Sequence, residues 1–183
     1  MKKCWNAEEA VEQLARPLGR FVRYLCADPE RAADLTQESL LRVAESIDSF
    51  ECQSNLQTWA FTIARRVVAD YFRASKHAAA MVPIETEPEA LDEESDLESR
   101  VIVDEMGACV QDVIGRLPED HRVALILRDL EGFSVAEVAK IAECTLATAK
   151  IRVHRARRQL QQALGRECEF YKSSENVLRC ERR

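Results

Sequence analysis

The sequence predicts an all-α protein with two small helical domains joined by an acidic linker. Glycine and proline, which interrupt helices, occur only 5 times each among 183 residues. Apolar residues recur at steps of three and four, the spacing that places them on one face of a helix. The segment from Pro83 to Ser99 is rich in Glu and Asp and contains no basic residue, so it is predicted to repel itself and remain extended.

The first domain should contain three or four helices, and the helix predicted from Asp34 to Ile47 has two distinct faces. Its apolar face consists of Leu40, Val43, Ala44 and Ile47. Leu41 lies apart from this face, among Asp34, Gln37, Glu38 and Glu45. A small apolar anchor with a charged rim is typical of a polar surface that docks another protein.

The following helix is predicted from Leu56 to Arg73. Its core face comprises Leu56, Ala60, Ile63, Ala64, Val67 and Tyr71. Its other side carries Phe61, Arg65, Val68 and Phe72, with Arg66 and Arg73 nearby. Aromatic residues interleaved with arginines can stack on unpaired bases and follow a nucleic-acid backbone. The alternative is that each phenylalanine packs on a neighbouring helix.

The acidic linker sets the predicted domain boundaries. The first domain is expected at 1–77, the linker at 78–99, the second domain at 100–165 and a C-terminal tail at 166–183. A charged run of this kind is commonly a solvated tether. The alternative is an acidic segment that mimics nucleic acid or lies in a basic channel of a partner.

The second domain contains a predicted helix-turn-helix between Glu131 and Arg158. Ser134 is the expected N-cap of a short first helix from Val135 to Ala142, and Glu137 completes a capping box. The turn consists of Glu143, Cys144 and Thr145. The apolar stripe of the second helix consists of Leu146, Ala149, Val153, Ala156, Leu160 and Leu164. A short helix, a tight turn and a longer basic helix suit docking in the major groove of DNA.

The opposite face of this second helix carries cations and no acid. Its outward residues are Thr148, Ile151, Arg152, His154, Arg155, Arg158 and Gln162, with Lys150 and Arg157 on the flanks. In a chain of formal net charge −6, a basic stripe confined to one helix indicates nucleic-acid phosphate as the partner. The alternative is a solvated cationic face on an ordinary helical hairpin.

Several classes of protein do not fit the sequence. It contains no HExxH, nucleophile motif or glycine-rich phosphate loop, so neither an enzyme nor a cofactor is predicted. No apolar run approaches the length of a membrane span, and the N-terminus turns acidic before a signal-peptide core forms, so a cytoplasmic location is expected. The 7 cysteines are an odd number without a CxxC pair, which argues against a secreted disulfide framework.

Two parts of the chain carry a resemblance to a known family. The segments DLTQESLLRVAESIDSF (Asp34 to Phe50) and LQTWAFTIARRVVADYFR (Leu56 to Arg73) resemble region 2 of bacterial RNA polymerase sigma factors. The segment from Leu117 to Leu164 resembles region 4 of the same proteins. Two such regions with a short linker resemble the extracytoplasmic-function (ECF) group, whose regions 2 and 4 are both small helical domains.

The resemblance implies a role for each face. The residues expected to bind the β′ clamp helices of core polymerase are Asp34, Leu35, Gln37, Glu38 and Leu41. Those expected to read or hold the −10 promoter element are Cys52, Gln53, Ser54, Asn55, Arg65, Arg66 and Arg73. Those expected to contact the −35 element are Thr145, Ala147, Thr148, Lys150, Ile151, Arg152, His154, Arg155 and Arg158. Ile151 has no hydrogen-bonding side chain, so it is expected to contact a thymine methyl group.

The resemblance also implies the function and the partners. A sigma factor binds core RNA polymerase, through the β′ clamp helices and the β flap, and directs transcription initiation at promoter DNA. An anti-sigma factor that covers the same docking faces is a further implied partner, and no part of the chain is expected to insert into a membrane. The alternatives are a free-standing helix-turn-helix regulator and a metal- or thiol-responsive sigma factor.

The tail from Arg166 to Arg183 is not required by the ECF pattern. The run from Ser173 to Asn176 favours a turn, so a hairpin is expected to bring Cys168 and Cys180 near each other. Two neighbouring sulfurs can form a reversible disulfide or supply half of a tetrahedral metal site. The alternative is a pair of reduced thiols on a frayed terminus.

Overall fold

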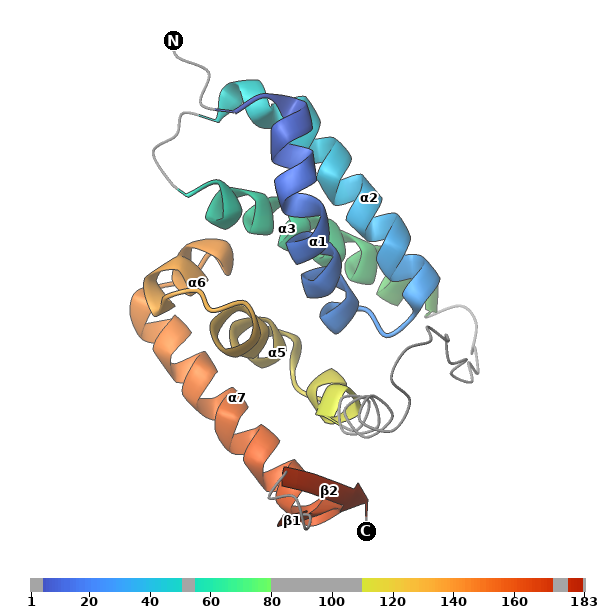
Figure 1. Ribbon diagram of the computed structural model, residues 1–183, viewed down its shortest axis with the longest axis vertical. Coiled ribbons are helices and arrows are strands. Elements are labelled where there is room, and N and C mark those ends of the chain that lie inside the picture. Colours follow the sequence, from blue (N-terminus) through green and yellow to red (C-terminus); the bar gives the residue numbers. More distant parts are fainter. Residues whose placement is uncertain (1–4, 51–54, 80–109, 173–177, 183) are drawn as a thin grey trace.

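The computed structural model describes residues 5–50, 55–79, 110–172 and 178–182. Within these residues the regular structure is helical, apart from one two-stranded hairpin close to the C-terminal end. Helices α1 to α3 form what we call the N-terminal unit, and α5 to α7 form the C-terminal unit (Figure 1). The all-α prediction is therefore confirmed apart from the hairpin, while the predicted acidic linker lies outside the described residues from residue 80 onward.

The N-terminal unit begins with two antiparallel helices. Helix α1 (Ala7–Leu25) starts in a capping box made by Asn6 and Glu9. Helix α2 (Pro29–Ser46) continues into a short 3-10 turn, η1 (Ile47–Ser49). Helix α2 starts earlier than predicted because Asp28 caps it, accepting from the backbone N–H of Glu30 at 3.0 Å, and because a proline is well suited to the first helical position.

The buried face of α2 is rotated from the predicted one. Leu35, Ser39 and Val43 are buried, whereas the predicted core residues Leu40 and Ala44 are only half-buried. Ser39 is a polar residue in this core, and its hydroxyl donates to the Leu35 carbonyl oxygen at 2.6 Å. That hydrogen bond satisfies the hydroxyl and allows it to be buried.

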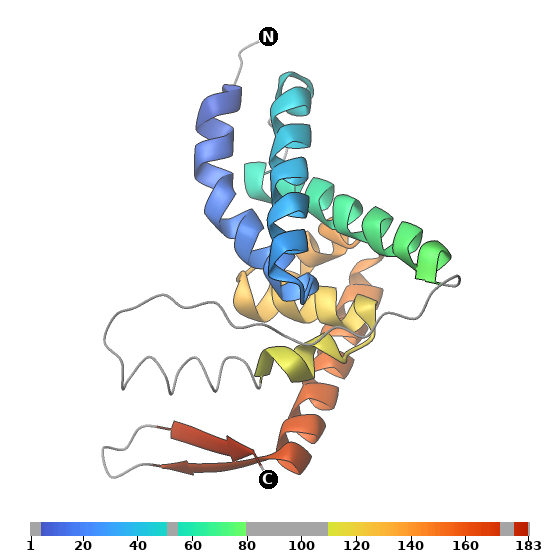
Figure 2. The ribbon, with the colours of Figure 1, turned by 90° about the vertical axis from the view of Figure 1, so that its right-hand side faces the viewer.

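Helix α3 (Leu56–Ala79) crosses beneath α1 and α2 (Figures 1 and 2). The predicted core residues Leu56, Ala60, Ala64 and Val67 are buried, and Ile63 and Tyr71 are half-buried. Phe61 and Val68, which were predicted to face outward, are 1% and 4% exposed. For Phe61 the alternative of packing on neighbouring elements is thus the correct one, because the C-terminal unit lies against this side of α3.

The C-terminal unit opens with a helical segment at 110–115 and helix α5 (Glu119–Leu125). Helix α5 runs directly into a π-helix, η2 (Ile126–Leu130), in which the Glu131 N–H donates to the Ile126 carbonyl oxygen at 2.9 Å. A π-helix contains one residue more per turn than an α-helix and is often found at functional sites.

The helix-turn-helix follows η2. Helix α6 (Val135–Ile141) begins in the predicted capping box of Ser134 and Glu137. Helix α7 (Leu146–Glu167) is capped by Thr145 and is the longest element of this unit. Ala149, Val153 and Ala156 are buried as predicted, but Leu146 is 47% exposed and its predicted core position is wrong. Helical side chains point back toward the N-terminus, so at the first position of α7 no preceding turn covers Leu146.

The tail forms an antiparallel hairpin of β1 (Cys168–Lys172) and β2 (Leu178–Arg182), which confirms the predicted hairpin. The two units above it share one hydrophobic core, with α3 packed against α6 (Figure 2). No helix among the described residues is long and apolar enough to cross a membrane.

Candidate nucleic-acid interface

The N-terminal half of α7 presents a cationic, solvent-exposed face. Thr145 Oγ1 accepts from the Thr148 backbone N–H at 3.1 Å, which fixes the start of the helix. Beyond this cap, six of the predicted contact residues are exposed, namely Ala147, Lys150, Ile151, His154, Arg155 and Arg158, and Thr148 is half-buried. Ile151 is 51% exposed on this face. An apolar side chain among cations is suited to contact a thymine methyl group in the major groove.

Two arginines of α7 are paired with carboxylates of their own unit. Arg152 is paired with Asp120 of α5, and its side chain is only 22% exposed. Arg157 is paired with Asp129 of η2, which raises the pKa of the guanidinium through their hydrogen bond. Lys150, Arg155 and Arg158 make no ion pair with any residue that the structure describes, so these cations remain open to an anionic partner.

The arginines of α3 are arranged differently. Arg65 Nη1 lies 2.8 Å from Glu143 Oε2, and Arg66 is paired with the other oxygen of the same carboxylate. Arg73 is paired with Asp70 one turn earlier on α3, at 3.0 Å. All three predicted −10 arginines therefore already contact a carboxylate, and two of them contact one that belongs to the C-terminal unit.

Glu143 lies in the turn of the helix-turn-helix with φ at 51°. A positive φ is uncommon for a residue with a side chain, and here it is part of the tight connection between α6 and α7. The hydrogen bond from Arg66 lowers the pKa of the Glu143 carboxyl, and the same bond raises the pKa of Arg66. Glu143 is therefore ionised at neutral pH, and its negative charge is held against the arginines of α3.

The predicted base-reading loop lies mostly outside the described residues. Cys52, Gln53 and Ser54 lie outside the residues that the structure describes, and Asn55 is exposed at the start of α3. Asn55 Oδ1 accepts from the Gln57 backbone N–H at 3.0 Å and so caps the helix.

The predicted polymerase-binding face of α2 is exposed except at one position. Leu41 is 59% exposed, the Asp34 side chain is 67% exposed, and Gln37 is exposed between them. Glu38 lies 2.6 Å from Arg42 on the same face. Leu35, by contrast, is 4% exposed and belongs to the core, so it is not available for a surface contact in this conformation.

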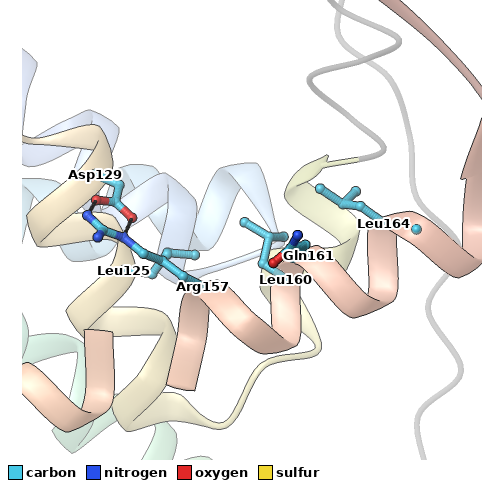
Figure 3. Close-up of a pocket in the computed structure, with 7 residues that line it drawn as sticks. Leu125, Asp129, Arg157, Leu160, Gln161 and Leu164 are labelled. Atoms are coloured by element: carbon cyan, nitrogen blue, oxygen red, sulfur yellow. Dashed lines mark hydrogen bonds and ion pairs between the residues drawn. The ribbon is translucent and has the colours of Figure 1, made fainter. Parts of the chain in front are cut away.

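An apolar groove lies along the C-terminal half of α7 (Figure 3). Its cavity of about 440 Å³ is lined by Leu125, Asp129, Arg157, Leu160, Gln161, Leu164 and Gly165. The Arg157–Asp129 ion pair closes one end of the groove, and the leucines of α5 and α7 line the rest. The groove lies beyond the cationic face along the helix, so both surfaces of α7 can be occupied at once.

The tail cysteines are offset in the hairpin. Cys168 is buried and opposite Arg182, whereas Cys180 is opposite Phe170. Diagonal positions of this kind are about 7–8 Å apart, beyond the usual Cα separation in a disulfide. Within the described part of the chain, no group of three or more His, Cys, Asp or Glu side chains is arranged to hold a metal ion.

Sequence reasoning missed the residues that join the two units. Arg20 of α1 donates through Nε and Nη2 to Glu131 at 2.8 and 2.6 Å. Phe133 packs edge-on against Phe61, with ring centroids 4.8 Å apart. Glu131, Phe133 and Glu143 all fall within or beside the helix-turn-helix motif, and nothing local to that motif distinguishes them from ordinary turn residues.

Comparison with known proteins places both units in one family. Residues 10–78 match the family model Sigma-70 region 2, and residues 107–160 match Sigma-70, region 4. The chain is 35% identical over 147 residues to the ECF RNA polymerase sigma factor EcfG of Rhodopseudomonas palustris, covering 80% of this chain and 78% of that protein. It is 36% identical over 150 residues to the ECF RNA polymerase sigma factor SigC of Mycobacterium tuberculosis, covering 82% and 78%.

Solved structures agree with these matches. The chain is similar to the sigma factor RpoE of Bartonella quintana, solved in complex with the anti-sigma factor NepR, at a TM-score of 0.71 and 29% identity. The similarity covers 86% of this chain and 96% of that chain, which is more than either unit alone contains.

Proposed function

The chain belongs to the ECF sigma factors of RNA polymerase, and we propose on this basis which of its faces bind polymerase and which bind each promoter element. As a sigma factor, it binds core RNA polymerase and directs transcription initiation at promoter DNA. Sigma factors are initiation factors, and we propose that this one has no catalytic activity of its own. We also propose that it acts in the cytoplasm.

We propose that the exposed face of α2 docks on the β′ clamp helices. The face comprises Asp34, Gln37, Glu38 and Leu41, and Leu35 is left out of it because it is buried. Leu41 is the observation that carries this assignment, since a leucine that is 59% exposed within a ring of polar groups is suited to enter a partner's apolar pocket.

We propose that the N-terminal half of α7 reads the −35 element in the major groove. The contacting residues are Thr145, Ala147, Thr148, Lys150, Ile151, His154, Arg155 and Arg158. Arg152 is assigned to positioning, because its guanidinium is held by Asp120. Positive side chains without a carboxylate partner among the described residues favour phosphate contacts, and those nearest the groove floor favour bases.

We propose that the start of α3 and its arginines hold the −10 element. Asn55 and the preceding Cys52, Gln53 and Ser54 would face the separated bases. Arg65, Arg66 and Arg73 would contact the phosphate backbone of the separated strand. The division into polymerase and −10 binding at 1–77, a tether at 78–99, −35 binding at 100–165 and a separate tail at 166–183 follows from this assignment.

Two protein partners complete the proposal. The apolar groove between α5 and α7 is assigned to the β flap of core polymerase, because it lies away from the −35 face and leaves that face free for DNA. An anti-sigma factor is the second partner, supported by the complex of the Bartonella quintana relative with NepR. The tail cysteines are not assigned a metal or a disulfide.

The assignment of α2 is tested by the double substitution Leu41→Arg with Glu38→Lys. This variant should keep the helical circular dichroism of the wild type and lose co-purification with core polymerase. Glu12→Lys, a charge reversal on the exposed side of α1, is the matched control and should still co-purify. A double variant that unfolds would show a structural face, and one that still binds polymerase would place the docking surface elsewhere.

A further inference from the structure

The two units are joined by an apolar contact between aromatic rings. Phe21 of α1, Phe61 of α3 and Phe133 of the C-terminal unit form a continuous row, with ring centroids 5.0 and 4.8 Å apart. All three rings are buried, and Phe133 is 6% exposed. Aromatic contacts of this geometry add stability beyond the area they bury, so the units are packed together rather than merely touching.

Ion pairs surround this apolar contact. On one side, Arg20 holds the Glu131 carboxylate, whose side chain is 3% exposed. On the other, Glu143 bridges Arg65 and Arg66. Thr58 of α3 is buried, and its hydroxyl lies 3.4 Å from the Glu137 side chain of the C-terminal unit. Every carboxylate in these contacts comes from the C-terminal unit, and the guanidinium groups come from the N-terminal unit.

This packed arrangement cannot bind both promoter elements at once. The −10 and −35 elements lie about 25 base pairs apart, which is about 85 Å along B-form DNA. A compact chain of this length has a radius of gyration of only about 16 Å. The two units must therefore separate before α3 and α7 can reach their elements together.

We propose that Glu143 is an intramolecular competitor for the phosphates of the −10 strand, and that the free chain rests in a closed form. In this form the −35 face of α7 is exposed, whereas Arg65 and Arg66 of α3 are occupied by the turn of the helix-turn-helix. The inference rests on the proposed function, because it takes these arginines as the ones that hold the −10 strand.

The exposure of the pair makes this competition reversible. The Arg66 and Glu143 side chains are 58% and 42% exposed, so water and salt screen their attraction. A phosphate backbone presents a comparable negative charge, and one guanidinium cannot give the same N–H groups to both. A partner that holds the units apart, such as core polymerase bound to each unit, thus frees both arginines, and the energy it must supply goes mainly to the buried Arg20–Glu131 pair and the aromatic row rather than to Glu143.

The test compares isolated full-length wild type with Glu143→Gln, which keeps the shape of the side chain and removes its charge. Asp112→Asn is the matched control, because it removes a similarly exposed carboxylate that pairs with Arg116 inside the C-terminal unit. Small-angle scattering reports closure, and two oligonucleotides report binding: a single strand with a −10 sequence and a duplex with a −35 sequence. If the Gln variant is unstable, Glu143→Asn replaces it in the same measurements, since Asn tolerates a positive φ.

Glu143→Gln should be more expanded than wild type and bind the single strand about fivefold more tightly. Asp112→Asn should change neither property, and the −35 duplex should bind the Gln variant and wild type alike. Two results overturn the inference: a Gln variant that is as compact as wild type, and a Gln variant that expands without gaining affinity for the single strand. In either case, binding of the −35 duplex would leave the proposed function intact. Failure of every variant to bind the duplex contradicts the proposed function itself.

Discussion

The cations of α3 and α7 are both on helix faces assigned to DNA, but they differ in what already holds them. Arg65, Arg66 and Arg73 each have a carboxylate within ion-pair distance. Among the described residues, Lys150, Arg155 and Arg158 have none. A helix with open cations binds phosphate by releasing only counterions, whereas α3 must first release a carboxylate of its own chain. The two faces are therefore expected to engage DNA in sequence rather than together.

The largest expected effect comes from breaking the Arg20–Glu131 ion pair, which holds the C-terminal unit against the N-terminal unit. Arg20→Ala leaves the buried Glu131 carboxylate without its guanidinium partner, which should cost the closed form about 2 kcal/mol. Small-angle scattering of the isolated chain should then show an expanded molecule. Arg23→Ala, an exposed residue on the same helix, is the control and should remain compact. An Arg20→Ala variant that stays compact would mean that the apolar contact and the Glu143 ion pairs suffice to hold the units together.

The next largest effect is on the base preference at the −35 element, and it tests which residues of α7 read bases. Arg155→Ala or Lys150→Ala should lower the preference for one base pair of the −35 element about tenfold if the residue reads a base. Arg157→Ala is the control, because Arg157 is held by Asp129. Affinities for duplexes substituted one position at a time measure this preference. If both variants weaken all sequences alike and only the salt dependence falls, these residues position the helix and do not read the bases.

A smaller effect is expected at the aromatic row. Phe61→Leu removes the ring contacts with Phe21 and Phe133 and should destabilise the closed form by about 1 kcal/mol. Phe50→Leu removes a ring contact with Trp59 at 4.9 Å within the N-terminal unit, so it should lower stability without opening the chain. Urea unfolding combined with scattering separates these two outcomes. Equal opening by both substitutions would show that the row is not specific to the interface.

The smallest expected effect is on pH dependence. Arg66, and to a lesser degree Arg65, lower the Glu143 pKa in the closed form from its ordinary value of 4.5. A group with a lowered pKa stabilises the closed form fully above that ordinary value, and the stabilisation declines as the pH falls through the lowered value. Wild type should therefore open slightly at acidic pH, whereas Glu143→Gln should not show this component. Identical pH profiles of the two proteins would show that Glu143 is not ionised against these arginines.

Local signals explain the parts of the fold that the sequence predicted well. Ser134 and Glu137 are three residues apart and form their capping box without help from the rest of the chain, so the start of α6 could be identified. The hairpin in the tail was likewise predicted from a local signal, the turn-favouring run from Ser173 to Asn176. The start of α2 was missed because the apolar periodicity used to find the helix begins later. Asp28 as N-cap and Pro29 at the first helical position are nevertheless a local signal for that start.

Burial could not be predicted where it depends on distant segments. Leu35 and Leu40 are both apolar residues of α2, and only the packing of α1 and α3 decides that Leu35 is the buried one. Phe61 reads equally well as a base-stacking residue until Phe133 is placed against it. The pairing of Glu143 with Arg65 joins residues 78 positions apart, a contact that no periodicity or capping rule contains.

The π-helix η2 decides how many residues the chain can lose before the contact between the units is displaced. Glu131 and Phe133 follow directly after Ile126–Leu130. A π-turn holds one residue more than an α-turn, so deleting one residue there would restore ordinary α-helical winding with both side chains still facing the N-terminal unit. Deleting a second residue would rotate both side chains by about 100° around the helix axis. Related chains that lack one residue at this point would thus keep the matched surface between their units, whereas the loss of two would leave the same promoter faces on units that no longer fit each other.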